Sequence, residues 1–301
     1  MNFRNATLFL KKIKKIFREV FAALTYTNKC NKMETESNGR RNLKLIFESH
    51  AHYDDRAFDE DRDILLGSMP QNGIEYILNA CSTVDSVTRT LQLMDTYPFV
   101  YGALGVHPSE IAELDEERFA WIREQFSHPK AVAVGEIGLD YYWDKEDEVQ
   151  ARQREWFARH LAMAKELDKP VVIHSRDAAK DTYDVLSACG GNDLRAVVHC
   201  FSYTKETAKQ YLNWDYYFGI GGVVTFANGK KLKEVVEYIP LERILLETDS
   251  PYLSPVPFRG KRNSSLHLPY VAQEIARIKG IDAETVIEVT NRNAKQLFGI
   301  R

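Results

Sequence analysis

Cysteine is scarce in this chain, and no two cysteines have the spacing of a thiolate zinc site. Cys30, Cys81, Cys189 and Cys200 lie far apart in a sequence of 301 residues that contains no CxxC motif. Scattered thiols of this kind are typical of proteins from a reducing compartment, where disulfides do not persist. We therefore expect a cytoplasmic protein that needs neither a disulfide framework nor thiolate ligands.

The sequence also lacks a uniform apolar run of about 18 residues, so it predicts no transmembrane helix. The N-terminal stretch "LFLKKIKKIFREVFAAL" (8–24) instead places apolar residues along one helical stripe and lysines on the other face. We predict that residues 1–42 form a basic amphipathic extension with a polar linker, outside the main domain. Either its helix contacts a membrane surface or a partner, or the segment is a poorly ordered extension upstream of Met33.

A broad excess of positive charge is missing from most of the chain. Residues 1–47 contain 11 Lys and Arg against 3 Asp and Glu, whereas the remainder contains 29 against 40. A body with a net charge of −11 lacks the basic surface of a tight nucleic-acid-binding protein. Any attraction for an anionic substrate must therefore be local.

Short apolar or β-branched runs recur from Leu43 onward, separated by longer charged segments with helical periodicity. By first residue they are "LKLIF" (43), "IEYIL" (74), "FVYGALG" (99), "AVAVGEIG" (131), "PVVIH" (170), "RAVVH" (195), "YYFGIGG" (216) and "RILLE" (243). This alternation predicts strand–helix units and a parallel sheet. An open doubly wound sheet would need a glycine-rich phosphate turn after an early strand, and "ESHAH" is not one. We predict an α/β fold, a (β/α)8 TIM barrel formed as one domain by residues 43–301.

Metal-binding side chains recur where the predicted strands end, which is the end of a barrel that carries active sites. His50 and His52 alternate along an extended segment, so both side chains point the same way. The full set contains five of the eight histidines and two carboxylates: His50, His52, His107, Glu136, His174, His199 and Asp249. Barrel closure would bring these separate strand ends onto one rim.

Each member of this set also has an ordinary structural interpretation. The two carboxylates could be loop residues, the two later histidines could be hydrogen-bonded core residues, and His107 could shape the turn before Pro108. The combination favours a metal site, because imidazole and carboxylate ligands together suit zinc, manganese or magnesium. Five or six ligands around a central carboxylate predict two divalent ions about 3.5–4 Å apart.

Two further stretches are candidates for substrate binding. The basic loop "FRGKRN" (258–263) follows the last strand end, where barrels often bind phosphate. We predict that Arg259, Lys261 and Arg262 bind a phosphate; a solvated charged loop is the alternative. The aromatic residues "YYW" (141–143) either stack on unpaired bases or pack the loop against the barrel.

The motifs "SHAHYDDRAFDEDR", "YGALGVHPSE", "AVGEIGLDYYWD", "KPVVIHSRDA", "VVHCFS" and "LLETDSPYLSPVPFRGKRN" resemble, in order, those of the TatD family of metal-dependent deoxyribonucleases, within the amidohydrolase-like superfamily. The resemblance runs from about Leu43 to Gly299. It implies that His50, His52 and Asp249 bind one metal and that Glu136 bridges to a second, held by His174 and His199. One departure is Glu48, where the family usually has Asp, which affects the surroundings of His50 rather than the ligands.

These observations together predict a hydrolase that cleaves phosphodiester bonds in DNA, acting as an exonuclease on ends or single strands. Two cations would lower the pKa of water and stabilise the charge on the phosphate. Asp249 and Glu136 are the predicted catalytic residues, with Asp249 as the base, and His107 is a further predicted substrate-binding residue. The alternative is a small-molecule hydrolase that cleaves an ester, lactone or amide with the same metals.

Overall fold

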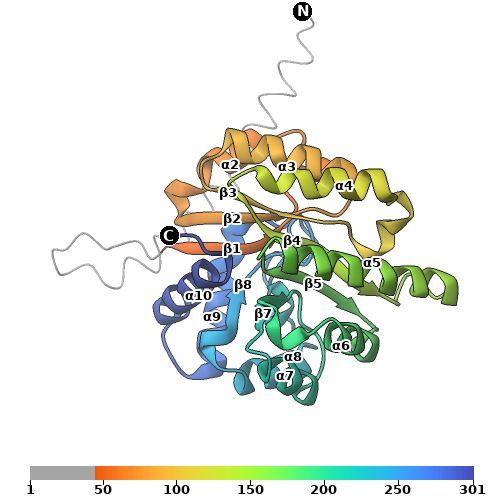
Figure 1. Cartoon of the computed structure of the whole chain (residues 1–301). Coiled ribbons are helices and arrows are strands. Elements are labelled where there is room, and N and C mark those ends of the chain that lie inside the picture. Colours follow the sequence, from red (N-terminus) through yellow and green to blue (C-terminus); the bar gives the residue numbers. More distant parts are fainter. Residues whose placement is uncertain (1–44) are drawn as a thin grey trace, which may run out of the picture. The chain divides into compact units, whose positions relative to one another are not determined.

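The computed structural model describes residues 45–301, in which eight parallel strands pair in the order of the chain (Figure 1). The strands are β1 (Ile46–Ala51), β2 (Ile74–Ala80), β3 (Val100–Leu104), β4 (Ala131–Asp140), β5 (Val171–Arg176), β6 (Ala196–Val198), β7 (Tyr217–Ile220) and β8 (Ile244–Leu246). A parallel bridge between Ala51 and Ser250 brings the chain after β8 back to β1. The predicted TIM barrel is thus confirmed, and the extension predicted for residues 1–42 lies outside the described residues.

Helices follow the strands and cover the outside of the sheet (Figure 1). They are α2 (Arg62–Ser68), α3 (Val84–Thr96), α4 (Glu116–Glu124), α5 (Asp147–Glu166), α6 (Ala179–Ala188), α7 (Lys205–Leu212), α8 (Lys230–Tyr238), α9 (Leu268–Lys279) and α10 (Ala283–Phe298). Short polar residues begin several of them: Thr83, Asp115 and Asp282 accept hydrogen bonds from backbone N–H groups in the first turns of α3, α4 and α10. Gly280 and Gly299 end α9 and α10 in the left-handed conformation that glycine adopts without strain.

Two strands extend further than the apolar runs indicate. β1 contains His50, and β4 continues through the whole of "GEIGLD" to Asp140. All sixteen residues of these two strands are buried. Polar side chains that the sequence places after strands therefore lie within the hydrogen-bonded sheet, which holds them more rigidly than a loop would.

A layer of apolar side chains fills the interior of the barrel beneath the strand ends. It takes residues from every strand and closes on the end of α10: Phe47, Leu78, Ala103, Val132, Ala133, Val172, Val197, Tyr217, Leu245, Ala294, Leu297, Phe298 and Ile300. Val172 and Val197 each precede a site histidine by two residues, so this apolar layer lies directly below the polar groups of the site. A packed interior of this kind is typical of barrels, whose centres are filled rather than open.

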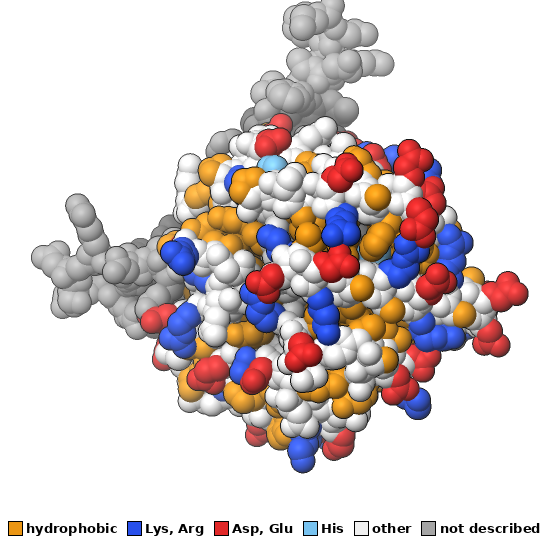
Figure 2. All heavy atoms as spheres, in the orientation of Figure 1, with side chains coloured by type: hydrophobic (Ala, Val, Ile, Leu, Met, Phe, Trp, Pro, Cys, Tyr) orange, Lys and Arg blue, Asp and Glu red, His pale blue; other side chains and the backbone are white. Residues whose placement is uncertain are grey.

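The described residues bear on three features of the sequence: membrane-spanning helices, cysteines and surface charge. Within residues 45–301, no helix is both long and apolar enough to cross a membrane. Among the same residues, Cys81, Cys189 and Cys200 are free thiols. On the face shown in Figure 2, acidic and basic side chains are interspersed, and no broad basic field is visible.

Candidate metal centre

The structure brings the six predicted metal ligands together at the carboxyl ends of the strands. His50 belongs to β1 and His52 follows it; Glu136 lies in β4 and His174 in β5. His199 and Asp249 follow β6 and β8. Backbone bonds join the two ends of the sheet: His52 N–H donates to Ser250 and Asp249 N–H donates to His50 O.

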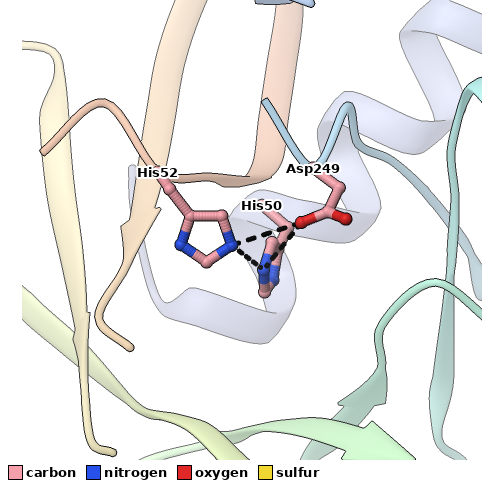
Figure 3. Close-up of side chains that lie close together, drawn as sticks. All are labelled: His50, His52 and Asp249. Carbon is pink, nitrogen blue, oxygen red and sulfur yellow. Dashed lines mark hydrogen bonds and ion pairs between the residues drawn. The ribbon is translucent and has the colours of Figure 1, made fainter. Parts of the chain in front are cut away.

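His50, His52 and Asp249 form the first cluster, in which the ring nitrogens and the carboxylate converge (Figure 3). The two Nε2 atoms lie 3.2 Å apart, and Oδ1 of Asp249 is 3.2 Å from His52 Nε2 and 3.8 Å from His50 Nε2. Asp249 has a positive φ of 58°, a backbone conformation that aspartate tolerates better than most residues. Nδ1 of His52 contacts Ala80 O at 2.8 Å, which fixes the ring with Nε2 facing the cluster.

Glu136 lies between this cluster and a second one. Its Oε2 is 3.2 Å from His50 Nε2. Its Oε1 is 2.7 Å from His174 Nδ1 and 3.1 Å from His199 Nε2. One buried carboxylate therefore faces two groups of imidazole nitrogens with its two oxygens, which is the arrangement of a ligand shared by two cations.

Burial and neighbouring charges shift the pKa values of these groups in opposite directions. Burial alone would raise the pKa of Glu136, but His199 and His50 hold it well below its usual range. Burial lowers the pKa of His52, but the hydrogen bond and charge of Asp249 raise it to about 9. Without a cation, ionised carboxylates thus face at least one protonated imidazole. The donor set fits divalent ions, which replace such protons when imidazole and carboxylate ligands bind them.

Glu247, which is not among the residues predicted from the sequence, lies next to His50 and His199. Its Oε1 accepts a hydrogen bond from Cys200 N–H at 2.6 Å and is 3.4 Å from His199 Nδ1. Oε2 of Glu247 and Nδ1 of His50 are both buried without a hydrogen-bond partner. His50, His199 and Glu247 nevertheless form a third possible metal-binding group, in which one ligand atom from each lies within 4.8 Å of the other two. A Cβ on Gly219 would lie 1.9 Å from Glu247 Oε2, so the carboxylate occupies the space that glycine leaves. In the sequence, Glu247 and Asp249 are two residues apart in "ETD", which is the same spacing as that of the two histidines in "HAH".

Asp140 is a second residue of the site that the sequence did not predict. Its Oδ2 is 3.0 Å from His174 Nε2, and its Oδ1 accepts hydrogen bonds from the backbone of Tyr142 and Trp143. A carboxylate that orients a ligating imidazole is a common outer contact in metal sites. Asp140 ends the "GEIGLD" motif four residues after Glu136. It reaches the site because β4 is longer than the sequence indicates and continues to this residue.

His107 shapes the turn before Pro108 and also lies beside the metal centre. Its Nδ1 accepts a hydrogen bond from Ser109 N–H at 3.2 Å, which shapes the turn. Its Nε2 is 3.8 Å from Glu136 Oε1, and its ring packs edge-on against His174. Burial, reinforced by the charge of His174, lowers the pKa of His107 to about 3, so the ring is neutral at the rim of the site.

Glu48 uses its longer side chain to join the first and last parts of the barrel. Its carboxylate accepts hydrogen bonds from His50 N–H, from Thr248 N–H and hydroxyl, and from the Ser265 hydroxyl. Burial raises the pKa of Glu48 to about 8, although these hydrogen bonds act in the opposite sense. It holds the backbone of His50 against the segment that carries Asp249.

The three cations of the basic loop differ in their surroundings. Arg262 forms a two-pronged ion pair with Asp61 and donates to Ala57 O, so its charge is already neutralised. The Arg259 guanidinium lies 4.4 Å from the centre of the Phe226 ring. Lys261 is exposed, and no carboxylate of residues 45–301 forms an ion pair with it. Among residues 45–301, Arg259 and Lys261 are thus the two cations of this loop whose charge no carboxylate pairs.

Comparison with known proteins identifies the family. The family model described as "TatD related DNase" matches residues 47–299. The chain belongs to this family. It is 40% identical to an uncharacterized metal-dependent hydrolase, YabD, of Bacillus subtilis, over 85% of this chain and 100% of that protein. It is 31% identical to a protein named "3'-5' ssDNA/RNA exonuclease TatD" of a Rahnella species, over 85% of this chain and 98% of that protein.

A solved structure agrees with this assignment. The crystal structure of the TatD homologue YjjV of Escherichia coli superimposes with a TM-score of 0.80 at 28% identity, over 86% of this chain and 100% of that one. The match supports the predicted TatD-family resemblance. Family membership and the clustered ligands together make this chain a metal-dependent hydrolase that uses divalent metal.

Proposed function

We propose that this TatD-family hydrolase cleaves phosphodiester bonds of single-stranded DNA or of DNA ends, with two divalent ions, Mg²⁺, Mn²⁺ or Zn²⁺, bound at the centre. The observation that carries the proposal is the position of Glu136, whose two oxygens face separate histidine clusters. His50, His52 and Asp249 would hold one ion, and His174 and His199 the other, with Glu136 shared. Bound there, the ions supply Lewis acidity, which lowers the pKa of water and stabilises negative charge on the phosphate oxygens.

The protein groups divide the remaining work. Burial opposes ionisation of Asp249, but the hydrogen bond with His52 lowers its pKa, so it is ionised at neutral pH. It is also the ligand with the greatest exposure, 18% of its side chain, against 4% for Glu136. An ionised and accessible carboxylate can take the proton of an attacking water, which makes Asp249 the proposed base.

Proton release on metal binding tests the donor set. Binding of Zn²⁺ or Mn²⁺ is expected to displace the proton of His52, because a ligating imidazole must be neutral. His52 has a pKa of about 9, and although burial lowers the pKa of His199, Glu136 and Glu247 raise it well above its usual range, so metal affinity should rise as the pH rises above 7. Calorimetric titrations in buffers with different ionisation enthalpies measure the protons released. Binding at pH 7 without proton release would remove His52 from the ligand set or contradict its protonation.

Lys261→Ala is expected to raise KM for oligonucleotides several-fold and to flatten the salt dependence of KM by about one charge, because a single phosphate contact is lost. Metal content should be unchanged. Lys209→Ala is a matched control, since Lys209 is an exposed lysine in the last turn of α7, at the opposite end of the barrel. Equal salt dependence in both variants would show that the loop does not bind phosphate and would favour a small, uncharged substrate.

A direct assay tests the proposal as a whole. End-labelled single-stranded and double-stranded oligonucleotides are incubated with the full chain and each of the three ions. We expect stepwise shortening of single strands or frayed ends. Hydrolysis of esters or lactones without any cleavage of oligonucleotides would instead establish the small-molecule alternative.

A further inference from the structure

Two exposed aromatic side chains and an arginine form a cluster beside the metal centre. The exposed fraction is 43% for Tyr142 and 67% for Trp143, and their rings meet edge to face at 4.7 Å. The guanidinium carbon of Arg176 lies 4.0 Å from the centre of the Tyr142 ring and 5.6 Å from that of Trp143. We call Tyr142, Trp143 and Arg176 the aromatic platform.

The platform is tied to the metal centre by one carboxylate. Asp140 contacts His174 through Oδ2, and through Oδ1 it accepts hydrogen bonds from Tyr142 N–H at 2.9 Å and Trp143 N–H at 3.1 Å. Arg176 pairs with Asp140 in the β4–β5 register, and its carbonyl accepts a hydrogen bond from Tyr141 N–H. The backbone that carries the rings is therefore fixed relative to His174.

The three consecutive aromatic residues differ in what they do. The Tyr141 hydroxyl donates to Asp181 and accepts from Arg154, so this side chain packs the loop against α5 and α6. The side chains of Tyr142 and Trp143 are exposed. Of the two sequence interpretations of residues 141–143, packing thus describes Tyr141, and the other two rings remain open to a ligand.

The position of the platform follows from the barrel topology. In a sheet ordered from β1 to β8, the β4–β5 pair lies across the barrel from the β8–β1 junction. The platform stands at the first of these places, and Asp249 and the Lys261 loop stand at the second. A chain of nucleotides that crosses the mouth of the barrel can therefore reach Lys261 on one side of the metal centre and the platform on the other.

We propose that Trp143, held edge to face by Tyr142, stacks on an unpaired nucleobase of the substrate strand, next to the phosphate held at the metal centre, with Arg176 facing the adjoining phosphate. The inference rests on the proposed nuclease function and names the residues that contact the base beside the cleaved bond. Every base has a π-face, so stacking is tolerant of sequence but requires a base that is free of its partner. Among residues 45–301, no carboxylate forms an ion pair with Arg176, so its charge is available to a phosphate. A stable protein interface buries roughly 800 Å² on each partner, and two exposed rings offer far less surface area than this. This disfavours a protein ligand.

Oligonucleotides with and without bases at the end to be cleaved test this inference. Trp143→Leu is expected to weaken binding of a base-bearing single strand by about tenfold, the effect of losing one stacked base. A strand whose terminal residues are abasic should bind the unchanged protein about tenfold less tightly, and Trp143→Leu should not weaken that binding further. Arg176→Gln should weaken both strands equally, because it removes a phosphate contact. Tyr238→Leu, which alters an exposed ring at the end of α8 and at the opposite end of the barrel, should change neither.

Binding is measured by fluorescence anisotropy of labelled strands in Ca²⁺ and cleavage separately in Mn²⁺, so the two proposals can fail independently. Discrimination against abasic strands that depends on Trp143, in a protein that cleaves no oligonucleotide, supports the platform and overturns the nuclease function. Cleavage of base-bearing and abasic strands with equal KM, unaffected by Trp143→Leu, overturns the platform and leaves the nuclease function standing.

Discussion

Glu136→Gln is expected to lower turnover of any substrate by about a thousandfold or more. The carboxylate faces imidazole nitrogens on both sides, at 3.2 Å through Oε2 and at 2.7 and 3.1 Å through Oε1. An amide carries no charge and presents hydrogen atoms to one of the clusters, so a shared cation site cannot form. Loss of about 4 kcal/mol of charge stabilisation corresponds to about three orders of magnitude in rate.

Metal content and rate are measured together for this variant. Glu110→Gln is the matched control, since Glu110 is an exposed carboxylate on the neighbouring 3-10 helix Pro108–Glu113. The control should keep the wild-type metal content and rate, and Glu136→Gln should lose at least one ion. A Glu136→Gln protein with full metal content and near-normal turnover would contradict the bridging role.

Asp249→Asn is expected to lower kcat by about a hundredfold to ten thousandfold, the range for loss of a general base. The shape of the side chain is kept, and the cluster of Glu136, His174 and His199 does not include it. One metal site should therefore survive while the rate falls. The acidic limb of the pH–rate profile should also disappear, because the group that must be ionised is gone.

Asp177→Asn is the control for this change. Asp177 follows β5 with a positive φ of 53°, as Asp249 follows β8 with 58°, but it is exposed and outside the metal centre. Both substitutions place asparagine in the left-handed conformation, which asparagine tolerates. Equal and small effects of the two changes would show that Asp249 is not the base.

The barrel could be predicted because its evidence is local and repeated. Each strand is a short apolar run, as in "VVIH", and each long helix has a charged face. In α5, for example, the segment predicted from the sequence runs from Glu146 to Leu167. The helix itself is Asp147–Glu166, one residue shorter at each end. The exact strand ends could not be predicted, because burial within the barrel, rather than propensity, decides whether a polar segment such as "GEIGLD" stays in the sheet.

The ligand set could be predicted from residue types at strand ends, but the groups around it could not. Glu247 and Asp140 resemble ordinary acidic residues in the sequence, and only the packing of β7 and β5 beside them shows that they face His199 and His174. Arg262 shows the opposite case. A basic loop near phosphate chemistry indicates anion binding, yet Asp61, 201 residues earlier in the chain, already neutralises this arginine.

Titration of the metal-stripped protein with Mn²⁺, followed by cleavage of a labelled single-stranded oligonucleotide, shows whether the centre needs two ions to cleave DNA. We expect that activity is absent without metal, rises with the second equivalent of bound Mn²⁺ and is lost again on chelation. Full activity with one bound ion would contradict the two-ion centre. An oligonucleotide left intact by protein that holds two ions would contradict the proposed function.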